Sequence, residues 1–266
     1  MGTPFITTAD AMGRPLTLAR RPRRIVSLVP SQTELLADIG LDAEVIGLTK
    51  FCVHPADWRR RKAVIGGTKN PRIAEIVALE PDLILANKEE NSRQIVEDLA
   101  PHAPVYVTDV GDLPTALTMI RAVGALVGRA EAAEALADGI DADFGALEAE
   151  IAAREGPRPR VGYLIWKGPY MAAGGDTFID AMLARGGWVN GFGERPRYPE
   201  VTVDALRAAR LDRLYLSSEP FPFGPSHAAE LRAALPGVDV RCVDGEPFTW
   251  YGSRLRKTPR TLRALR

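Results

Sequence analysis

An internal repeat constrains the fold of this sequence more strongly than any other feature. The segment 73–86 has the same order of apolar and polar residues as the segment 203–216, and the same offset places Glu89 on Glu219. Each copy has the pattern of a helix, a turn and a buried strand, which is the αβ unit of parallel sheets. Because several segments recur in one order, we interpret the chain as two α/β lobes of similar topology.

Short apolar runs alternate with helical patterns in the first lobe, which predicts a mostly parallel sheet. Ile25–Val29 is β-branched and apolar, as a strand buried on both faces should be. Pro30 ends this strand, and Ser31 or Thr33 is expected to cap a helix at Glu34–Ile39. Further strands are expected at Val45–Gly47, Asp82–Ala86 and Val105–Val107, the last of them near Val240 in the repeat, and further helices at Ile73–Leu79 and Arg93–Leu99.

The strand pattern stops between the two copies of the repeat. Gly128 separates a predicted helix at 113–127 from a longer one at 130–154. Strands resume at Val161, and Asp176-Thr177 are expected to cap a later helix at Phe178–Leu183. The fold class is therefore predicted as α/β, with two Rossmann-like lobes joined by one long backbone helix. The predicted boundaries are 1–128 for the N-terminal lobe, 129–156 for the linking helix and 157–266 for the C-terminal lobe.

The composition excludes several classes of protein. Lys and Arg total 34, as do Asp and Glu, so the balanced charge provides no long-range attraction to nucleic acid. The histidines His54, His102 and His227 lack the spacing of helix-borne metal ligands, so we expect no metal site. Phosphate-binding loops and the serine nucleophile elbow are absent from the sequence, and we expect no catalytic residues.

Two further features bear on redox state and localisation. Cys52 and Cys242 are too few for a disulfide framework, and we interpret both as reduced packing residues, with a single bridge as the alternative. Met1–Arg24 is polar and basic, so we expect no export signal there. No run reaches the ~20 apolar residues of a membrane span.

Aromatic residues gather in the loops that are expected to follow the strands. Such loops line the ligand crevice of open α/β sheets, and clefts between domains are favoured ligand sites. The pattern indicates an aromatic slot for a large flat or apolar ligand, with lid packing as the alternative for each residue taken alone. The candidate ligand-binding residues are Phe51, His54, Lys69, Trp166, Tyr170, Phe221, Trp250, Tyr251 and Arg254.

Three segments resemble the helical-backbone (class III) substrate-binding proteins of ABC importers, which serve the uptake of vitamin B12, haem and iron-siderophores. These segments are Arg24–Leu36, Ile76–Ile84 with its Leu-Glu-Pro-Asp-Leu-Ile run, and Tyr198–Thr202. The likeness extends from about Arg23 to the C-terminus and is closest to the cobalamin binders. It implies two lobes joined by a rigid helix, and binding without catalysis.

The resemblance also implies which residues meet the ligand and the transporter. Trp250 matches a pocket tryptophan after the last strand, and Phe51–Pro55 match the loop after the second strand. Members of this family dock on their permease through one surface carboxylate in each lobe. Asp204 occupies that position in the C-terminal lobe, whereas in the N-terminal lobe Ala74 occupies it and Glu75 lies one residue away, about 100° around a helix.

We therefore expect a non-catalytic, monomeric receptor for a cobalamin-like corrinoid or similar large metal chelate, with no intrinsic cofactor and with an ABC permease as partner. A haem or ferric-siderophore receptor is the first alternative, because Lys69, Lys167 and Arg254 suit an anionic chelate and Tyr170 could ligate haem iron. A cytosolic relative that handles a metal cofactor is the second. The resemblance implies a periplasmic protein, whereas a native start at Met1 implies a cytoplasmic one.

Overall fold

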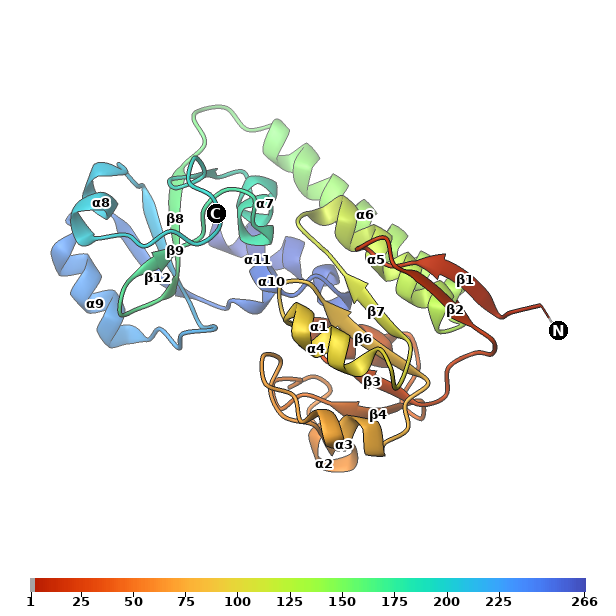
Figure 1. Ribbon diagram of the computed structural model, residues 1–266. Coiled ribbons are helices and arrows are strands. Elements are labelled where there is room, and N and C mark those ends of the chain that lie inside the picture. Colours follow the sequence, from red (N-terminus) through yellow and green to blue (C-terminus); the bar gives the residue numbers. More distant parts are fainter. Residues whose placement is uncertain (1–2) are drawn as a thin grey trace. The chain divides into compact units, whose positions relative to one another are not determined.

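The computed structural model describes residues 3–266. Met1 and Gly2, the first two residues of the segment in which we expect no export signal, lie outside the described residues. The chain forms two compact units (Figure 1). The first unit comprises the chain up to Val110, Pro114–Gly139 and Tyr251–Arg254; the second comprises Gly111–Leu113, Ile140–Trp250 and Leu255–Arg266. The predicted α/β class with mostly parallel sheets is confirmed.

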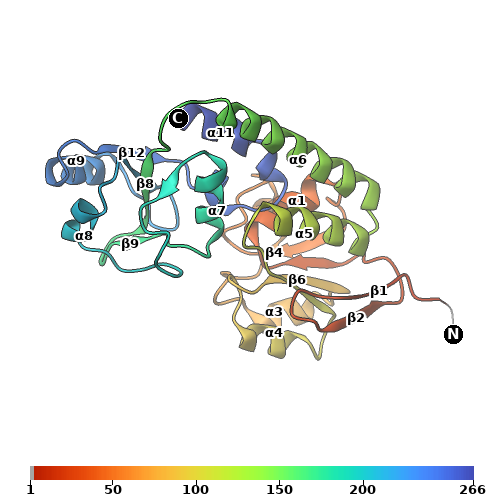
Figure 2. The ribbon, with the colours of Figure 1, turned by 90° about the horizontal axis from the view of Figure 1, so that it is seen from above.

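The first unit contains a five-stranded, fully parallel sheet in the order β5-β4-β3-β6-β7, and a separate antiparallel hairpin β1-β2. Figure 2 shows α1 and α5 on one face of the parallel sheet and α3 and α4 on the other. The strands are β1 (Ile6–Ala9), β2 (Pro15–Leu18), β3 (Ile25–Ser27), β4 (Val45–Leu48), β5 (Ala63–Val64), β6 (Leu83–Asn87) and β7 (Val105–Thr108). The helices are α1 (Pro30–Asp38), α2 (Trp58–Arg61), α3 (Ile73–Ala78), α4 (Arg93–Leu99) and α5 (Leu113–Leu126).

Helix α1 begins at Pro30 rather than at Glu34, and the predicted cap by Ser31 or Thr33 is wrong. Proline suits the first helical position because its missing N–H needs no partner there. Val29 precedes it and makes no side-chain capping bond. Thr33 lies inside the helix, where its Oγ1 is 2.9 Å from the Val29 carbonyl oxygen.

Helix α6 (Ala130–Ala152) is the long helix that the sequence predicted, and it ends two residues earlier than expected. The boundary between the two compact units falls within this helix, after Gly139. The division into 1–128, 129–156 and 157–266 stays a prediction, because compactness assigns parts of one helix to both units.

The second unit contains a sheet with the parallel strand order β10-β8-β11-β12, and β9 pairs antiparallel with β8. Figures 1 and 2 both show α8 and α9 on one face and α7 on the other. The strands are β8 (Arg160–Trp166), β9 (Met171–Ala172), β10 (Val189–Asn190), β11 (Arg213–Ser217) and β12 (Asp239–Val243). The helices are α7 (Phe178–Arg185), α8 (Val203–Ala208), α9 (Pro225–Ala234), α10 (Glu246–Thr249), a 3-10 turn (Ser253–Arg256) and α11 (Thr258–Leu265). The predicted cap of α7 at Asp176-Thr177 is confirmed for Thr177, whose Oγ1 accepts the Asp180 N–H at 3.1 Å.

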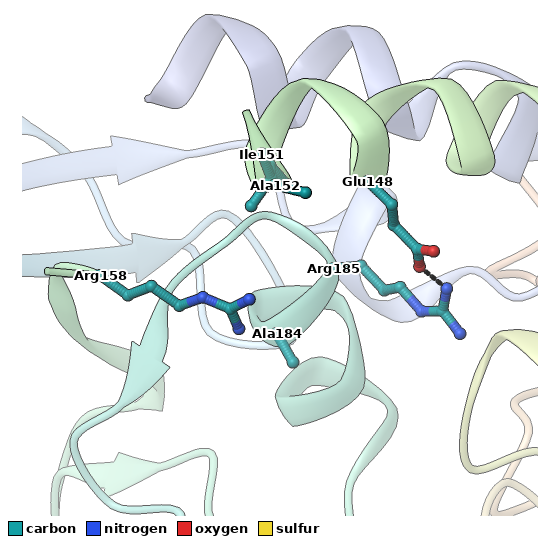
Figure 3. Close-up of a pocket in the computed structure, with 6 residues that line it drawn as sticks. All are labelled: Glu148, Ile151, Ala152, Arg158, Ala184 and Arg185. Atoms are coloured by element: carbon teal, nitrogen blue, oxygen red, sulfur yellow. Dashed lines mark ion pairs between the residues drawn. The ribbon is translucent and has the colours of Figure 1, made fainter. Parts of the chain in front are cut away.

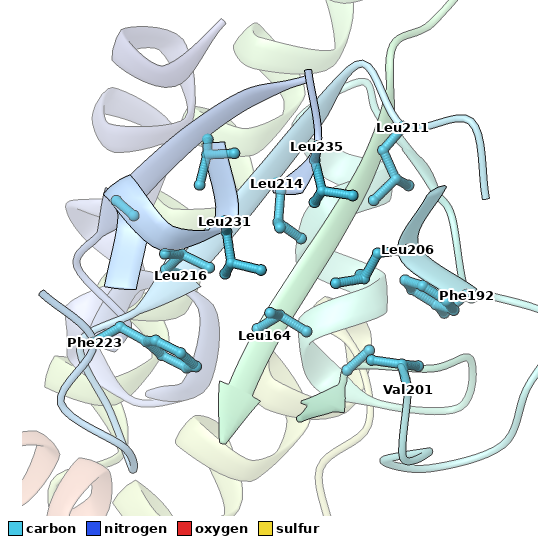
Figure 4. Close-up of a cluster of buried hydrophobic side chains, with 13 residues drawn as sticks. Leu164, Phe192, Val201, Leu206, Leu211, Leu214, Leu216, Phe223, Leu231 and Leu235 are labelled. Atoms are coloured by element: carbon cyan, nitrogen blue, oxygen red, sulfur yellow. The ribbon is translucent and has the colours of Figure 1, made fainter. Parts of the chain in front are cut away.

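Alternating residues of the central strands form two apolar layers in the second unit. Leu164, Leu214 and Leu216 join a cluster with side chains of α8 and α9 (Figure 4). Tyr163 and Tyr215 point to the opposite face, because successive side chains of a strand alternate between faces. There their rings pack against Phe248 and Trp188, with the Tyr163 and Phe248 ring centroids 4.9 Å apart.

The two units share one anchoring arrangement at the start of their central strands. Asp82 Oδ1 accepts the Arg24 N–H at 2.8 Å, and Asp212 Oδ2 accepts the Arg160 N–H at 2.7 Å. The guanidinium groups of Arg24 and Arg160 donate to carbonyls at the C-terminal ends of α3 and α8. The repeat seen in the sequence is therefore also a repeat of contacts.

Backbone conformation and strand register follow the same repeat. Glu80 and Arg210, which lie three residues before β6 and β11 respectively, have positive φ angles of 46° and 48°. Where β6 pairs with β7, Val105 lies opposite Ile84, and where β11 pairs with β12, Val240 lies opposite Leu214. The predicted correspondence of Val105 with Val240 is confirmed.

Replacing Asp82 tests this anchoring arrangement. Asp82→Ala removes the acceptor of the Arg23 and Arg24 N–H groups, and we expect it to lower the free energy of unfolding of the first unit by about 1–2 kcal/mol in urea denaturation. Asp98→Ala is the matched control, because Asp98 is an exposed α4 carboxylate that bonds only the Gln94 side chain. Equal effects of the two substitutions would contradict the anchoring role.

Candidate functional site

The carboxyl edge of each sheet, meaning the edge at which its parallel strands end, bears the candidate ligand residues. In the first unit Phe51 follows β4 and is 51% exposed. Its ring packs on Gly67, where a Cβ would lie 3.3 Å from the ring, and the Lys50 ammonium is 5.0 Å from the ring centroid. Lys69 is exposed on the loop after β5, and its ammonium donates to the Glu89 carbonyl. His54 is half-buried on the Phe51 loop.

Buried amide side chains brace the loops of the first unit. Asn91 donates from Nδ2 to the Thr68 carbonyl at 2.9 Å, which ties the loop after β6 to the loop after β5. Asn87 donates to the Thr108 carbonyl at 3.1 Å, and Gln32 of α1 donates to the Thr108 hydroxyl. These contacts hold the loop backbones in place around the more exposed Phe51 and Lys69.

Both cysteines are free. Cys52 is buried, its Sγ lies 3.1 Å and 3.2 Å from the hydroxyls of Thr33 and Thr49, and burial raises the pKa of the thiol. Cys242 is exposed. The interpretation as a packing residue is therefore confirmed for Cys52 and wrong for Cys242.

Arg254 forms a buried ion pair rather than an open cationic position. Its guanidinium donates to both carboxylate oxygens of Glu34 on α1, at 2.6 and 2.8 Å, and the two side chains are 10% and 9% exposed. Gly252 lies so close to the Ser31 carbonyl that a Cβ would come within 2.4 Å of its oxygen. Tyr251 is buried in the same segment. The segment Tyr251–Arg254 is thus packed onto α1 within the first unit.

An aromatic cluster lies at the carboxyl edge of the second unit. Trp166 is 41% exposed and is the last residue of β8, so its predicted place in a loop is wrong by one residue. Its ring meets Phe221 edge-on, with centroids 5.6 Å apart. Phe221 also packs against Phe223 and His227, at 4.8 and 5.4 Å. The structure therefore brings together two predicted site residues, Trp166 and Phe221, on a shared apolar support.

Tyr170 belongs to a polar group beside this cluster. Its hydroxyl donates to Glu230 Oε1 at 3.0 Å, and Lys167 donates to the other oxygen of Glu230 at 2.5 Å. Burial, followed by the hydrogen bond to Glu230, raises the pKa of the Tyr170 phenol. The Tyr170 hydroxyl is thus engaged by Glu230, and an iron ion could bind it only by displacing this hydrogen bond.

Trp250 is held by a carboxylate that the site prediction did not include. The indole Nε1 of Trp250 donates to Glu219 Oε1 at 3.0 Å, and the Thr249 hydroxyl donates to the same oxygen. Trp250 is only 6% exposed. Glu219 follows β11 and Trp250 follows α10, so the contact joins loops that succeed two adjacent parallel strands.

The predicted docking carboxylates are exposed near the starts of the two repeated helices. Glu75 is the third residue of α3 and pairs with Arg72. Asp204 is the second residue of α8 and pairs with Arg207 at 2.7 Å. The one-residue difference expected from the repeat is present in the structure, because Ala74 occupies the second position of α3.

A hollow of about 350 Å³ lies elsewhere in the second unit (Figure 3). It is lined by the ends of α6 and α7, with an ion pair between Glu148 and Arg185, and by Arg158, which precedes β8. It therefore lies at the edge where the strands begin and is separate from the candidate ligand residues. Among residues 3–266 we find no group of three or more His, Cys, Asp or Glu that could hold a metal ion, and no helix long and apolar enough to cross a membrane.

Sequence reasoning missed three acidic residues that organise the site. They are Glu34, Glu219 and Glu230, which hold Arg254, Trp250 and Tyr170 respectively. For Glu219 a signal was available, because the repeat already matched it with Glu89. For Glu34 and Glu230 the partners lie 220 and 60 residues away in sequence, and no local pattern points to them.

A family model described as "Periplasmic binding protein" matches residues 25–219. A cobalamin-binding protein of Halobacterium salinarum is 27% identical over 78% of this chain and 60% of its own length. An uncharacterized ABC transporter substrate-binding lipoprotein of Bacillus subtilis is 30% identical over 50% of this chain and 42% of its own length. The chain thus spans about half the length of these two relatives. A vitamin B12-binding protein of Vibrio parahaemolyticus is 23% identical over 94% of this chain and 90% of its own length.

Solved structures share the fold of this chain. The periplasmic heme-binding protein from Roseiflexus sp. RS-1 aligns with a TM-score of 0.78 at 21% identity, over 91% of this chain and 96% of that one. The periplasmic vitamin B12 binding protein of Vibrio cholerae aligns with a TM-score of 0.78 at 18% identity, over the same shares. These likenesses establish the fold and leave the ligand to be argued from the site.

Replacing Arg254 tests whether it is a structural rather than a ligand-facing cation. Arg254→Ala leaves the buried Glu34 carboxylate without its partner, and we expect the free energy of unfolding to fall by about 3–5 kcal/mol. Arg263→Ala is the control, because the ion pair of Arg263 with Glu150 is largely exposed and is worth about 0–1 kcal/mol. The double variant Glu34→Ala, Arg254→Ala should be more stable than Arg254→Ala alone. Equal losses of unfolding free energy in Arg254→Ala and Arg263→Ala would refute the structural role of Arg254.

Proposed function

The chain belongs to the periplasmic binding protein family, and from this premise we propose that it is a non-catalytic substrate-binding protein of an ABC importer. Its ligand is a cobalamin-like corrinoid or similar large metal chelate, and its site of action is the periplasm. The carboxyl edges of its two sheets carry the ligand-binding residues. The relatives named for cobalamin and vitamin B12 binding support this proposal.

The observation that carries the proposal is the pair Trp166 and Phe221. Large aromatic side chains are ordinarily buried in a monomer, and Trp166 is 41% exposed at an edge where α/β sheets bind ligands. Its ring contacts Phe221, which in turn packs against Phe223 and His227, so the Trp166–Phe221 pair is supported without a ligand. Such a surface binds a broad, apolar ligand face by stacking.

The charged groups favour a corrinoid over an anionic chelate. Lys167 is paired with Glu230, Arg254 with Glu34, and Lys69 donates to a backbone carbonyl. Three of the cations that would attract carboxylates are thus already engaged. Tyr170 donates its hydroxyl to Glu230 rather than offering it to a metal.

A haem or ferric-siderophore ligand is the second candidate, and one observation favours it. The Lys50 ammonium lies 5.0 Å from the centroid of the exposed Phe51 ring. An aromatic face beside an ammonium group suits a flat ligand that carries carboxylates. The cytosolic handling of a metal cofactor has no comparable observation in its favour.

Cyanocobalamin titration tests the ligand proposal. We expect quenching of tryptophan fluorescence, with Trp166→Phe weakening affinity by about three- to tenfold because the stacking surface is smaller. Trp188→Phe is the control, since Trp188 is buried against Tyr215 on the other side of the sheet. The proposal would be refuted if tryptophan emission stayed unchanged at saturating cyanocobalamin, and also at saturating haemin and ferric siderophores.

Neutralising the docking carboxylates tests the transporter partner. The variant Glu75→Gln, Asp204→Asn should bind cyanocobalamin as tightly as the wild type, because both carboxylates are exposed and pair with Arg72 and Arg207 rather than with the proposed ligand-binding residues. Importer-dependent uptake should fall about tenfold or more, since each exposed carboxylate would lose a charge pair with the permease. Glu97→Gln, Asp98→Asn on α4 provides exposed acids as a control. Undiminished uptake by the docking variant would exclude these two residues from the interface.

A further inference from the structure

Glu219 presents its two carboxylate oxygens unequally. Oε1 accepts hydrogen bonds from the Trp250 indole and the Thr249 hydroxyl. For Oε2, by contrast, the described part of the chain supplies no hydrogen-bond donor. A carboxylate has about four lone-pair positions, so half of its accepting capacity is unused in the protein itself.

The neighbours of Glu219 hold the side chain in one orientation. Its backbone N–H donates to the Ser217 hydroxyl at 3.3 Å, and Ser217 in turn accepts from the Tyr163 hydroxyl at 3.1 Å. Gly245 lies against the side chain, and a Cβ there would come within 2.7 Å of Glu219 Cγ. Glu219 is therefore positioned before any ligand binds.

The surroundings make an additional hydrogen bond to this carboxylate valuable. Glu219 is largely buried, and that desolvation raises its pKa, with Asp244 and Glu246 adding further negative charge nearby. Oε2 is not among the buried side-chain oxygens that lack a partner, so solvent can reach it. A ligand that displaces this water must supply an N–H or O–H donor in its place, because an unsatisfied carboxylate oxygen is costly in partly desolvated surroundings.

We propose that Glu219 is a ligand-binding residue of the second unit, whose Oε2 accepts a hydrogen bond from an amide or hydroxyl group of the ligand while Oε1 positions Trp250. This assignment rests on the proposed function and adds a specificity determinant to it. A ligand with carboxamide side chains meets the acceptor favourably. A ligand with carboxylates places like charges together, so the same residue discriminates against haem-like anions.

Glu219→Gln tests the assignment, because glutamine keeps an acceptor for Trp250 and Thr249 but turns the second position into a donor. We expect cyanocobalamin affinity, measured by calorimetry, to fall at least about tenfold, and haemin affinity to stay equal or rise. Glu194→Gln is the matched control, since Glu194 is an exposed glutamate of the same unit, and it should bind both probes like the wild type. Tryptophan emission of the ligand-free protein should be unchanged in Glu219→Gln and shifted in Glu219→Ala, which removes the indole acceptor.

The outcomes separate this inference from the proposed function. Wild-type protein that binds neither probe defeats the proposed function, and the acceptor role falls with it. Wild-type protein that binds cyanocobalamin, with Glu219→Gln binding it as tightly as Glu194→Gln, overturns the acceptor role alone. Equal losses for both probes, accompanied by shifted emission of the ligand-free Glu219→Gln protein, would show that Glu219 has only a structural role. Tighter binding of haemin than of cyanocobalamin by the wild type would likewise overturn the discrimination.

Discussion

Each parallel sheet depends on one carboxylate at the beginning of a central strand. Asp82 and Asp212 accept the backbone N–H groups of Arg24 and Arg160, at the starts of β3 and β8. The guanidinium groups of these arginines donate to carbonyls at the ends of α3 and α8, the helices that precede Asp82 and Asp212. Helix, strand and neighbouring strand are thereby joined at the edge where the strands begin. The same register determines where the strands end, and the loops that carry the proposed ligand-binding residues start from those ends. The position of Glu219 is therefore a consequence of contacts made at the opposite edge of its sheet.

The fold was predictable from the sequence because its main signals are local. A helix, a turn and an apolar strand each leave a periodicity within about 15 residues, and the second copy at 203–216 confirmed the interpretation of the first. The start of α1 was not predictable in the same way. Pro30 is compatible both with the end of a strand and with the first position of a helix, and only tertiary packing selects the second role.

The candidate site was predictable in residue type but not in the role of each residue. Aromatic side chains at strand ends predict a ligand surface, and the rings of Trp166 and Phe221 do lie in contact there. The engagement of Arg254 could not be foreseen, since its partner Glu34 is 220 residues away and both residues also suit an exposed surface. Ion pairs between distant segments leave no periodic pattern, so a cation that looks available in sequence can be buried and neutralised in the fold.

A net charge of zero is compatible with the proposed specific recognition, because the charged side chains of this protein differ in how deeply they are buried. Exposed ion pairs are screened and contribute little selectivity, whereas a desolvated carboxylate interacts strongly over a short range. Glu219 is largely desolvated and accepts the Trp250 indole N–H, and it lies two residues before Phe221 of the proposed stacking surface. Stacking alone would not distinguish a carboxamide-bearing macrocycle from a carboxylate-bearing one of similar size. In the proposed role of Glu219 a fixed acceptor makes that distinction, because its oxygen accepts a hydrogen bond from the first ligand and repels the carboxylates of the second.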